Sequence, residues 1–212
     1  MYKYKLNLIF LLLLILSVFS FNSCIFVKYD NDEKIEIEPE IDLSPKPLVE
    51  LSNYMVRSHS GDMIAFLPKD WFLVNTENQI SSEVFAVAVN KEYNLSAVFT
   101  NHKNTEEFEA KFNQEGLFGL AWYALTKKEK KSAGLVKQVG KYQSLLMGTR
   151  RFVKYEYSTT TGTIISKSAV FKSTLNEYYE FTLVPLSVDG NSIPKQQEIN
   201  DIFQSILSGI KY

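Results

Sequence analysis

The clearest pattern of apolar and polar positions lies at the end of the chain. Apolar residues recur there at the three- and four-residue spacing of a single helix face, in a stripe made of Ile199, Ile202, Phe203, Ile206, Leu207 and Ile210. Pro194 precedes the stripe, and proline is tolerated close to a helix start. The pattern predicts a C-terminal amphipathic helix that packs its apolar face on a sheet.

Two other regions have the β-branched and aromatic runs, separated by turn residues, that are typical of strands. The predicted strands cover residues 63–67, 84–89, 95–100, 135–147, 150–159, 163–172 and 178–185. A short polar loop joins residues 84–89 to 95–100, which predicts a hairpin. Residues 152–157 carry apolar atoms on both faces, so we expect a sheet that is covered on both sides.

Between these strand regions, residues 104–131 change to helical spacing. Asn104 and Glu107 form a predicted capping box at the start. Gly116 and Gly119 weaken the middle, so either the helix continues or a second short helix packs under it, and we favour one helix with an interruption. The predicted order of elements is three strands, a helix, four strands and a final helix. This order predicts an α+β fold with an antiparallel sheet flanked by helices.

This layout is accompanied by three short motifs. They read Phe-Leu-Pro-Lys-Asp-Trp at 66–71, Tyr-Tyr-Glu-Phe-Thr-Leu at 178–183 and Ile-Phe-Gln-Ser-Ile-Leu at 202–207. Layout and motifs resemble the PsbP/DcrB-like α/β/α sandwich over most of residues 60–212. The motifs are structural, so the resemblance implies a binding or accessory protein without naming a ligand.

The N-terminus has the architecture of a signal peptide over residues 1–23. Lys3 and Lys5 precede an uninterrupted apolar run at residues 8–16. That run is shorter than the roughly 20 residues that a spanning helix needs. We therefore expect the segment to be cleaved, and an uncleaved signal anchor is the alternative.

Cys24, the only cysteine, directly follows Ser23, and this stretch resembles the lipobox of bacterial lipoproteins. Phe21 and Asn22 depart from the residues usual in that motif. The resemblance implies that Cys24 becomes a lipidated first residue carrying acyl chains such as palmitate. It also implies a location in the bacterial cell envelope, anchored to a membrane, with the outer membrane favoured and the domain facing the periplasm or the exterior.

Residues 24–50 are acidic and contain three prolines. From Ile25 to Glu50 there are eight acids against three bases, and Pro39, Pro45 and Pro47 punctuate the run. Such a composition predicts an extended tether, with a reach of about 80 Å at roughly 3.3 Å per residue. The alternation at residues 35–38 allows an edge strand instead. The folded domain is expected over residues 51–212.

Composition and charge exclude several classes of protein. The 212 residues are 45% hydrophobic, enough to bury a core, so a wholly disordered chain is excluded. A formal net charge of -1 gives no reason to expect nucleic acid as a partner. One cysteine excludes a disulfide framework and a thiolate zinc cluster, and lipidation would leave no free thiol.

Candidate chemistry is sparse. Ser58, His59, Ser60 and Asp62 contain the residue types of a hydrolase triad, but triads assemble from separate elements, and the chain has no Gly-x-Ser-x-Gly motif. We interpret them as a polar loop. With two histidines and no phosphate-binding glycine loop, we expect no catalytic residue, no metal and no cofactor. A non-enzymatic binding or accessory module is the leading hypothesis, and a hydrolase of envelope polymers is the alternative.

The strongest local signal is electrostatic. Nine bases stand against Glu129 alone in one segment: Lys127, Lys128, Lys130, Lys131, Lys137, Lys141, Arg150, Arg151 and Lys154. Brought together, they would attract an anionic lipid or an acidic protein partner. Solvated hairpin edges are the simpler interpretation. Trp71, Trp122 and Tyr123 could line a groove, although core packing is the more frequent fate of such residues.

Overall fold

The computed structural model describes residues 35–75, 81–159, 164–187 and 192–212, which belong to one compact unit, Ile35–Tyr212. The predicted signal peptide and Cys24 lie outside the described residues. None of the helices in the described ranges is both long enough and apolar enough to cross a membrane.

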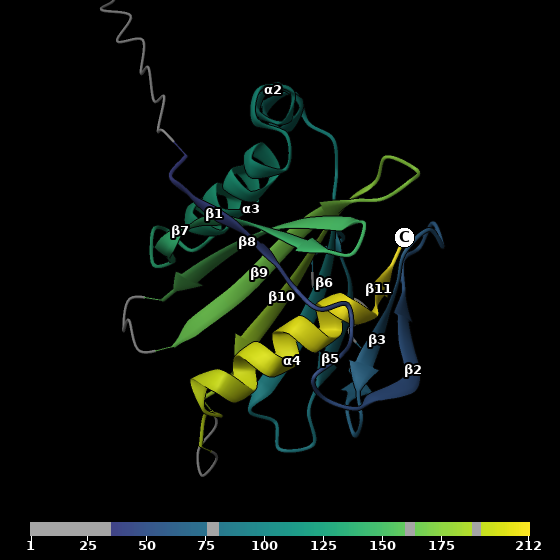
Figure 1. Cartoon of the computed structure of the whole chain (residues 1–212). Coiled ribbons are helices and arrows are strands. Elements are labelled where there is room, and N and C mark those ends of the chain that lie inside the picture. Colours follow the sequence, from purple (N-terminus) through teal and green to yellow (C-terminus); the bar gives the residue numbers. More distant parts are fainter. Residues whose placement is uncertain (1–34, 76–80, 160–163, 188–191) are drawn as a thin grey trace, which may run out of the picture. The chain divides into compact units, whose positions relative to one another are not determined.

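The described residues of this unit form eleven strands and three helices, whose arrangement Figure 1 shows. They are β1 Ile37–Asp42, β2 Leu51–Arg57, β3 Ile64–Pro68, β4 Phe72–Leu73, β5 Val84–Val89, β6 Leu95–His102, α2 Glu106–Glu115, α3 Leu117–Lys131, β7 Lys137–Met147, β8 Arg150–Ser158, β9 Ile165–Lys172, β10 Tyr178–Pro185, α4 Gln196–Gly209 and β11 Ile210–Lys211. Every strand predicted from the pattern is present within about two residues at each end.

The strands form two sheets. The large sheet has eight strands in the order β1-β7-β8-β9-β10-β6-β5-β4, and the small one has the order β11-β3-β2. All pairs are antiparallel except β1 with β7, in which Ile37 lies opposite Tyr142. The predicted hairpin is β5 and β6, where Val89 lies opposite Ser96.

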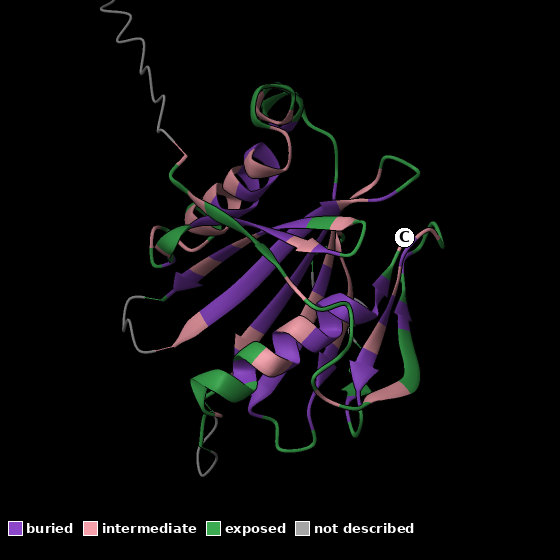
Figure 2. Ribbon diagram, in the orientation of Figure 1, coloured by how far each residue is buried: buried purple, intermediate pink, exposed green. Residues whose placement is uncertain are grey.

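Helices cover both faces of the large sheet, as Figures 1 and 2 show. On one face α4 packs through the predicted stripe, with Phe203 stacked on Phe181 of β10 at 5.4 Å between ring centres. On the other face, α3 buries Leu120 and Ala124 against Tyr155 of β8. Alternate residues of each central strand therefore enter two separate cores. The α+β prediction, helices flanking an antiparallel sheet, is confirmed.

The middle helical region divides into two helices rather than one interrupted helix. Gly116 separates them with a φ of 58°, a left-handed value that glycine adopts without a Cβ clash. At Gly119 an added Cβ would lie 2.3 Å from the carbonyl oxygen of Lys111, so the missing side chain lets α3 pack closely on α2. The cap also differs from the prediction: Thr105, not Asn104, accepts a hydrogen bond from the Phe108 amide at 3.2 Å.

The tether prediction fails for residues 37–42. This segment is the edge strand β1, and the Tyr142 amide donates to the Glu36 carbonyl at 3.0 Å. Farther along, the amides of Leu48 and Val49 donate to the Ser205 hydroxyl at 2.8 and 3.0 Å. The folded unit thus begins at Ile35 rather than Leu51, because backbone pairing to β7 does not require an apolar segment.

Candidate functional site

Glu180 is the centre of a buried polar cluster between the large sheet and α3. Its carboxylate accepts hydrogen bonds from Lys128 Nζ, 2.8 Å from both oxygens, and from Thr182 Oγ1 at 3.1 Å. The Tyr155 hydroxyl donates to it as well, and His102 Nε2 lies 3.1 Å from Oε2. An ionised carboxylate only accepts, so His102 holds a proton on Nε2.

The surroundings of Glu180 stabilise its charge. Burial raises the pKa of its carboxyl, but the charge of Lys128 and the contact with His102 outweigh burial and hold that pKa well below the usual value. Burial, followed by the Glu180 charge, raises the pKa of Tyr155 well above normal. Tyr155 therefore stays protonated and donates. The cluster is a closed set of internal partners and leaves the carboxylate no capacity for a ligand.

The sequence missed Glu180 as an important residue. One signal was available: a charged residue in the middle of an aromatic strand that the pattern predicts to be covered on both sides. A polar cavity of about 370 Å³ lies beside the cluster and is lined by residues that include His59, Glu83, His102 and Lys103. His102 Nδ1 has no hydrogen-bond partner in the described part of the chain. No group of three or more metal-ligating side chains occurs among the described residues.

Asp62 is the centre of a second cluster, which contains most of the predicted polar loop. The hydroxyls of Ser58 and Ser60 donate to Oδ1 at 2.9 and 2.6 Å, Tyr179 donates at 2.6 Å, and Ser173 donates to Oδ2. Burial raises the pKa of Asp62, but these four hydroxyl bonds lower it to about 2.

His59 takes no part in that cluster. Its ring lies 6.1 Å from the Phe85 ring, edge to face, and no hydrogen bond joins it to Asp62 within the described ranges. The serine, histidine and aspartate of this loop therefore do not form a charge-relay arrangement. Asp62 instead ties the turn between β2 and β3 to β10.

The nine bases of the predicted patch spread over α3, β7 and β8, and acids from elsewhere meet most of them. Glu83 pairs with Lys127, Glu180 with Lys128, Glu107 with Lys130, Glu36 with Lys141, Glu40 with Arg151 and Glu156 with Lys154. Arg150 donates to the Ser208 carbonyl at 3.2 Å. Lys131 and Lys137 have no ion pair among the described residues. A docking role for this segment stays a prediction, with much of its charge already compensated.

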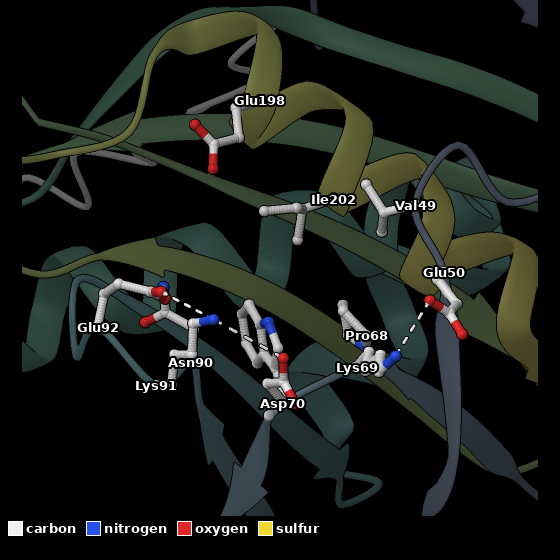
Figure 3. A pocket seen from close by; sticks show the side chains of 11 residues that line it. Val49, Glu50, Pro68, Lys69, Asp70, Asn90, Lys91, Glu92, Glu198 and Ile202 are labelled. Atoms are coloured by element: carbon white, nitrogen blue, oxygen red, sulfur yellow. Dashed lines mark hydrogen bonds and ion pairs between the residues drawn. The ribbon is translucent and has the colours of Figure 1, made fainter.

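A second cavity, of about 250 Å³, lies next to Trp71. We call it the Trp71 cavity. It lies between the β3–β4 turn, the β5–β6 loop and α4, and it is lined by Val49, Glu50, Pro68, Lys69, Asp70, Trp71, Asn90, Lys91, Glu92, Glu198 and Ile202. In Figure 3, Glu198 and Ile202 of α4 face Asp70, Asn90 and Glu92 across the opening.

The charges around this cavity are unevenly paired. Lys69 Nζ lies 3.5 Å from Glu50, and Lys91 Nζ lies 3.8 Å from Asp70 and 3.7 Å from Glu92. Glu198 has no ion pair within the described ranges. Four carboxylates and two ammonium groups line the cavity, so its surface is net negative.

The loop on one side of the cavity is held by internal hydrogen bonds. The buried Asn90 side chain donates to Asn94 Oδ1 at 2.6 Å and accepts from the amides of Asn94 and Leu95 at 3.0 Å. Asn94 in turn donates to the Ser192 carbonyl at 2.8 Å, which fixes the loop to the segment before α4. These bonds stabilise Tyr93 at a φ of 54°, an unusual value for a bulky residue.

Comparison with known proteins identifies the fold. No family model matches the chain, and no curated protein matches it. Among solved structures, cyanobacterial PsbP (CyanoP) from Synechocystis sp. PCC 6803 superposes with a TM-score of 0.57 at 11% identity, over 77% of this chain and 92% of that one. The chain has a PsbP-like fold. The Saccharomyces cerevisiae Ran-binding protein Mog1p gives a TM-score of 0.48 at 11% identity, over 76% of this chain and 96% of that one.

Proposed function

We propose that this protein is a lipid-anchored binding or accessory module of the bacterial cell envelope, with no catalytic role of its own. Cys24 would carry the acyl chains, and the unit from Ile35 onward would present the binding surface. The anchor rests on the sequence: the basic start, the short apolar run and Cys24 after Ser23.

The observation that supports the binding role is a difference between carboxylates that have internal hydrogen-bond donors and the carboxylates of the Trp71 cavity. Glu180 and Asp62, two carboxylates with lowered pKa values, are occupied by internal donors. The Trp71 cavity instead has more carboxylates than cations. Groups already bound inside the protein stabilise the fold, whereas excess charge in an accessible cavity favours a ligand.

The anchor is tested by metabolic labelling with an alkyne fatty acid in cells that make the full chain. We expect label on the native protein, no label on Cys24→Ala, and label on the control Ser44→Ala, in which an exposed serine of the folded unit changes. Mass spectrometry that finds an intact Met1 terminus and an unmodified Cys24 thiol would overturn the anchor.

The binding role is tested by placing a photo-crosslinking amino acid in the protein inside intact cells. At Lys91, on the rim of the Trp71 cavity, we expect a discrete adduct. At Glu109, exposed on α2 over the opposite sheet face, we expect none. Equal adducts at both positions, or none at either, would contradict the role. So would the loss of an envelope-polymer hydrolysis activity in His59→Ala.

A further inference from the structure

The volume of the Trp71 cavity limits what can enter it. At about 250 Å³ it is smaller than the roughly 300–1,000 Å³ typical of sites for whole small molecules or cofactors. A cavity of this size suits one amino-acid side chain and the backbone next to it.

Trp71 offers an unused hydrogen-bond donor at this place. The residue is only 6% exposed, and its indole N–H makes no hydrogen bond to the described residues. This N–H is not among the fully buried atoms that lack a partner in the described part of the chain, so it is open to an acceptor that enters the cavity. A peptide carbonyl from an incoming chain would supply the acceptor.

The charge of the cavity selects the kind of side chain. Glu198 lies in the first turn of α4 without an ion pair, and the two lysines stand 3.5 to 3.8 Å from the other three carboxylates. A positively charged side chain would pair with Glu198 and reduce the net negative charge of the lining. A carboxylate ligand would meet repulsion from the same groups.

Two exposed aromatic side chains lie next to the cavity-lining residues in the sequence. Phe72 and Tyr93 follow directly on the lining residues Trp71 and Glu92, and their rings pack edge to face at 5.3 Å. Both side chains remain exposed, at 40% and 53%. A side chain bound in the cavity can thus be part of a segment that extends over this aromatic pair, which favours a polypeptide over a free cation.

We infer that the Trp71 cavity binds an arginine or lysine side chain within an exposed segment of a protein partner. The neighbouring carbonyl of that segment accepts from the Trp71 indole, and the cation pairs with Glu198. This inference rests on the proposed binding role and gives it a site and a partner chemistry.

The first experiment titrates a capped Gly-Phe-Arg-Phe-Gly peptide into the detergent-solubilised full chain carrying Trp122→Phe, so that Trp71 is the only fluorophore of its kind. The comparison peptide carries citrulline, a neutral isostere of arginine. We expect the arginine peptide to quench the Trp71 fluorescence in a saturable way. The citrulline peptide should bind at least about three- to fivefold more weakly. High salt should weaken the binding of the arginine peptide.

The second experiment compares two glutamates that each lie in the first turn of a helix. Glu198→Gln should weaken the arginine peptide about three- to fivefold. Glu109→Gln, in the first turn of α2, should leave binding unchanged. If Trp122→Phe does not fold, the Trp71 indole resonance in a ¹H–¹⁵N spectrum of the chain with both tryptophans reports the same titration.

Three results would overturn the inference. They are no binding of the arginine peptide, equal binding of the arginine and citrulline peptides, and binding of arginine amide alone as tight as that of the peptide, which would point to a small cation. The Lys91 adduct in cells separates the two proposals: if it persists, the binding role stands and only this partner chemistry is wrong.

Discussion

Two carboxylate regions of this molecule have opposite designs. Glu180, buried between the large sheet and α3, receives donors from Lys128, Tyr155 and Thr182 and contacts His102. Glu198 lies on α4, over the other face, has no ion pair among the described residues and lines the same cavity as Trp71. The comparison teaches that the carboxylate with the strongly lowered pKa is held by internal donors, whereas the carboxylate without an ion pair among the described residues lies at the candidate binding site.

The largest expected effect comes from removing the structural carboxylate. Glu180→Ala leaves the Lys128 ammonium and the donors of Tyr155 and His102 without their common acceptor. We expect a loss of about 3–5 kcal/mol in the free energy of unfolding, measured by urea denaturation. Glu109→Ala, an exposed glutamate on α2, is the control and should change little. An equally small loss for Glu180→Ala would mean that the cluster contributes nothing to stability.

A smaller effect is expected at the second cluster. Asp62→Asn weakens the bonds from Ser60, Tyr179 and Ser173, and should cost about 2 kcal/mol at neutral pH. Because the pKa of Asp62 is lowered from 3.8 to about 2, the stabilisation is complete above pH 3.8 and is lost as the pH falls toward 2.

The gap in unfolding free energy between native protein and Asp62→Asn should therefore close over that acid range. Glu83, Glu156 and Glu180 also have lowered pKa values and titrate in both proteins, so the difference isolates Asp62. A gap that stays constant down to pH 2 would contradict the assignment.

Trp71→Phe tests the candidate binding site rather than the structural cluster. The indole N–H has no internal bond to lose, so we expect about 1 kcal/mol of lost stability from the smaller ring. Binding of the arginine peptide, followed by calorimetry, should fall at least fivefold. A large stability loss with unchanged binding would place Trp71 with the structural residues.

The smallest effect on stability is expected for Glu198→Gln. Without an ion pair to break, the substitution removes only a favourable charge near a helix N-terminus, about 0.5 kcal/mol or less at this exposed position. Thermal unfolding of this variant and of Glu109→Gln should give closely similar midpoints, since both changes remove a first-turn charge. A clear drop for Glu198→Gln alone would reveal a structural role.

Sequence patterns predict this fold well wherever the signal is local. The stripe from Ile199 to Ile210 predicts α4 and the face that it buries, and the runs in the second half predict β7 to β10 within about two residues. The predictions of one interrupted helix and of a cap at Asn104 were wrong: the structure has two helices divided at Gly116, and the cap is the next residue, Thr105. Neighbouring residues satisfy the same local capping rules, so such small shifts are not resolved by pattern alone.

Long-range pairing is what the sequence could not supply. Nothing in the acidic alternation at Ile37 indicates that β1 adds in parallel to β7, a partner about 100 residues later. The same limit applies to the basic segment. Counting charges along residues 127–154 does not reveal that Glu36 lies beside Lys141 and Glu40 beside Arg151 in the fold. The Trp71 cavity likewise lies between two loops and a helix that are far apart in the sequence, although Trp71 itself was a candidate.

The pairing of β1 with β7 also limits how far the module can operate from a bilayer. If Cys24 is acylated, only about 11 residues separate it from Ile35, a span of at most about 40 Å when fully extended, instead of the longer range that a free segment to Glu50 would allow. A protein anchored in this way would have a shorter reach toward partners that are fixed away from its own membrane.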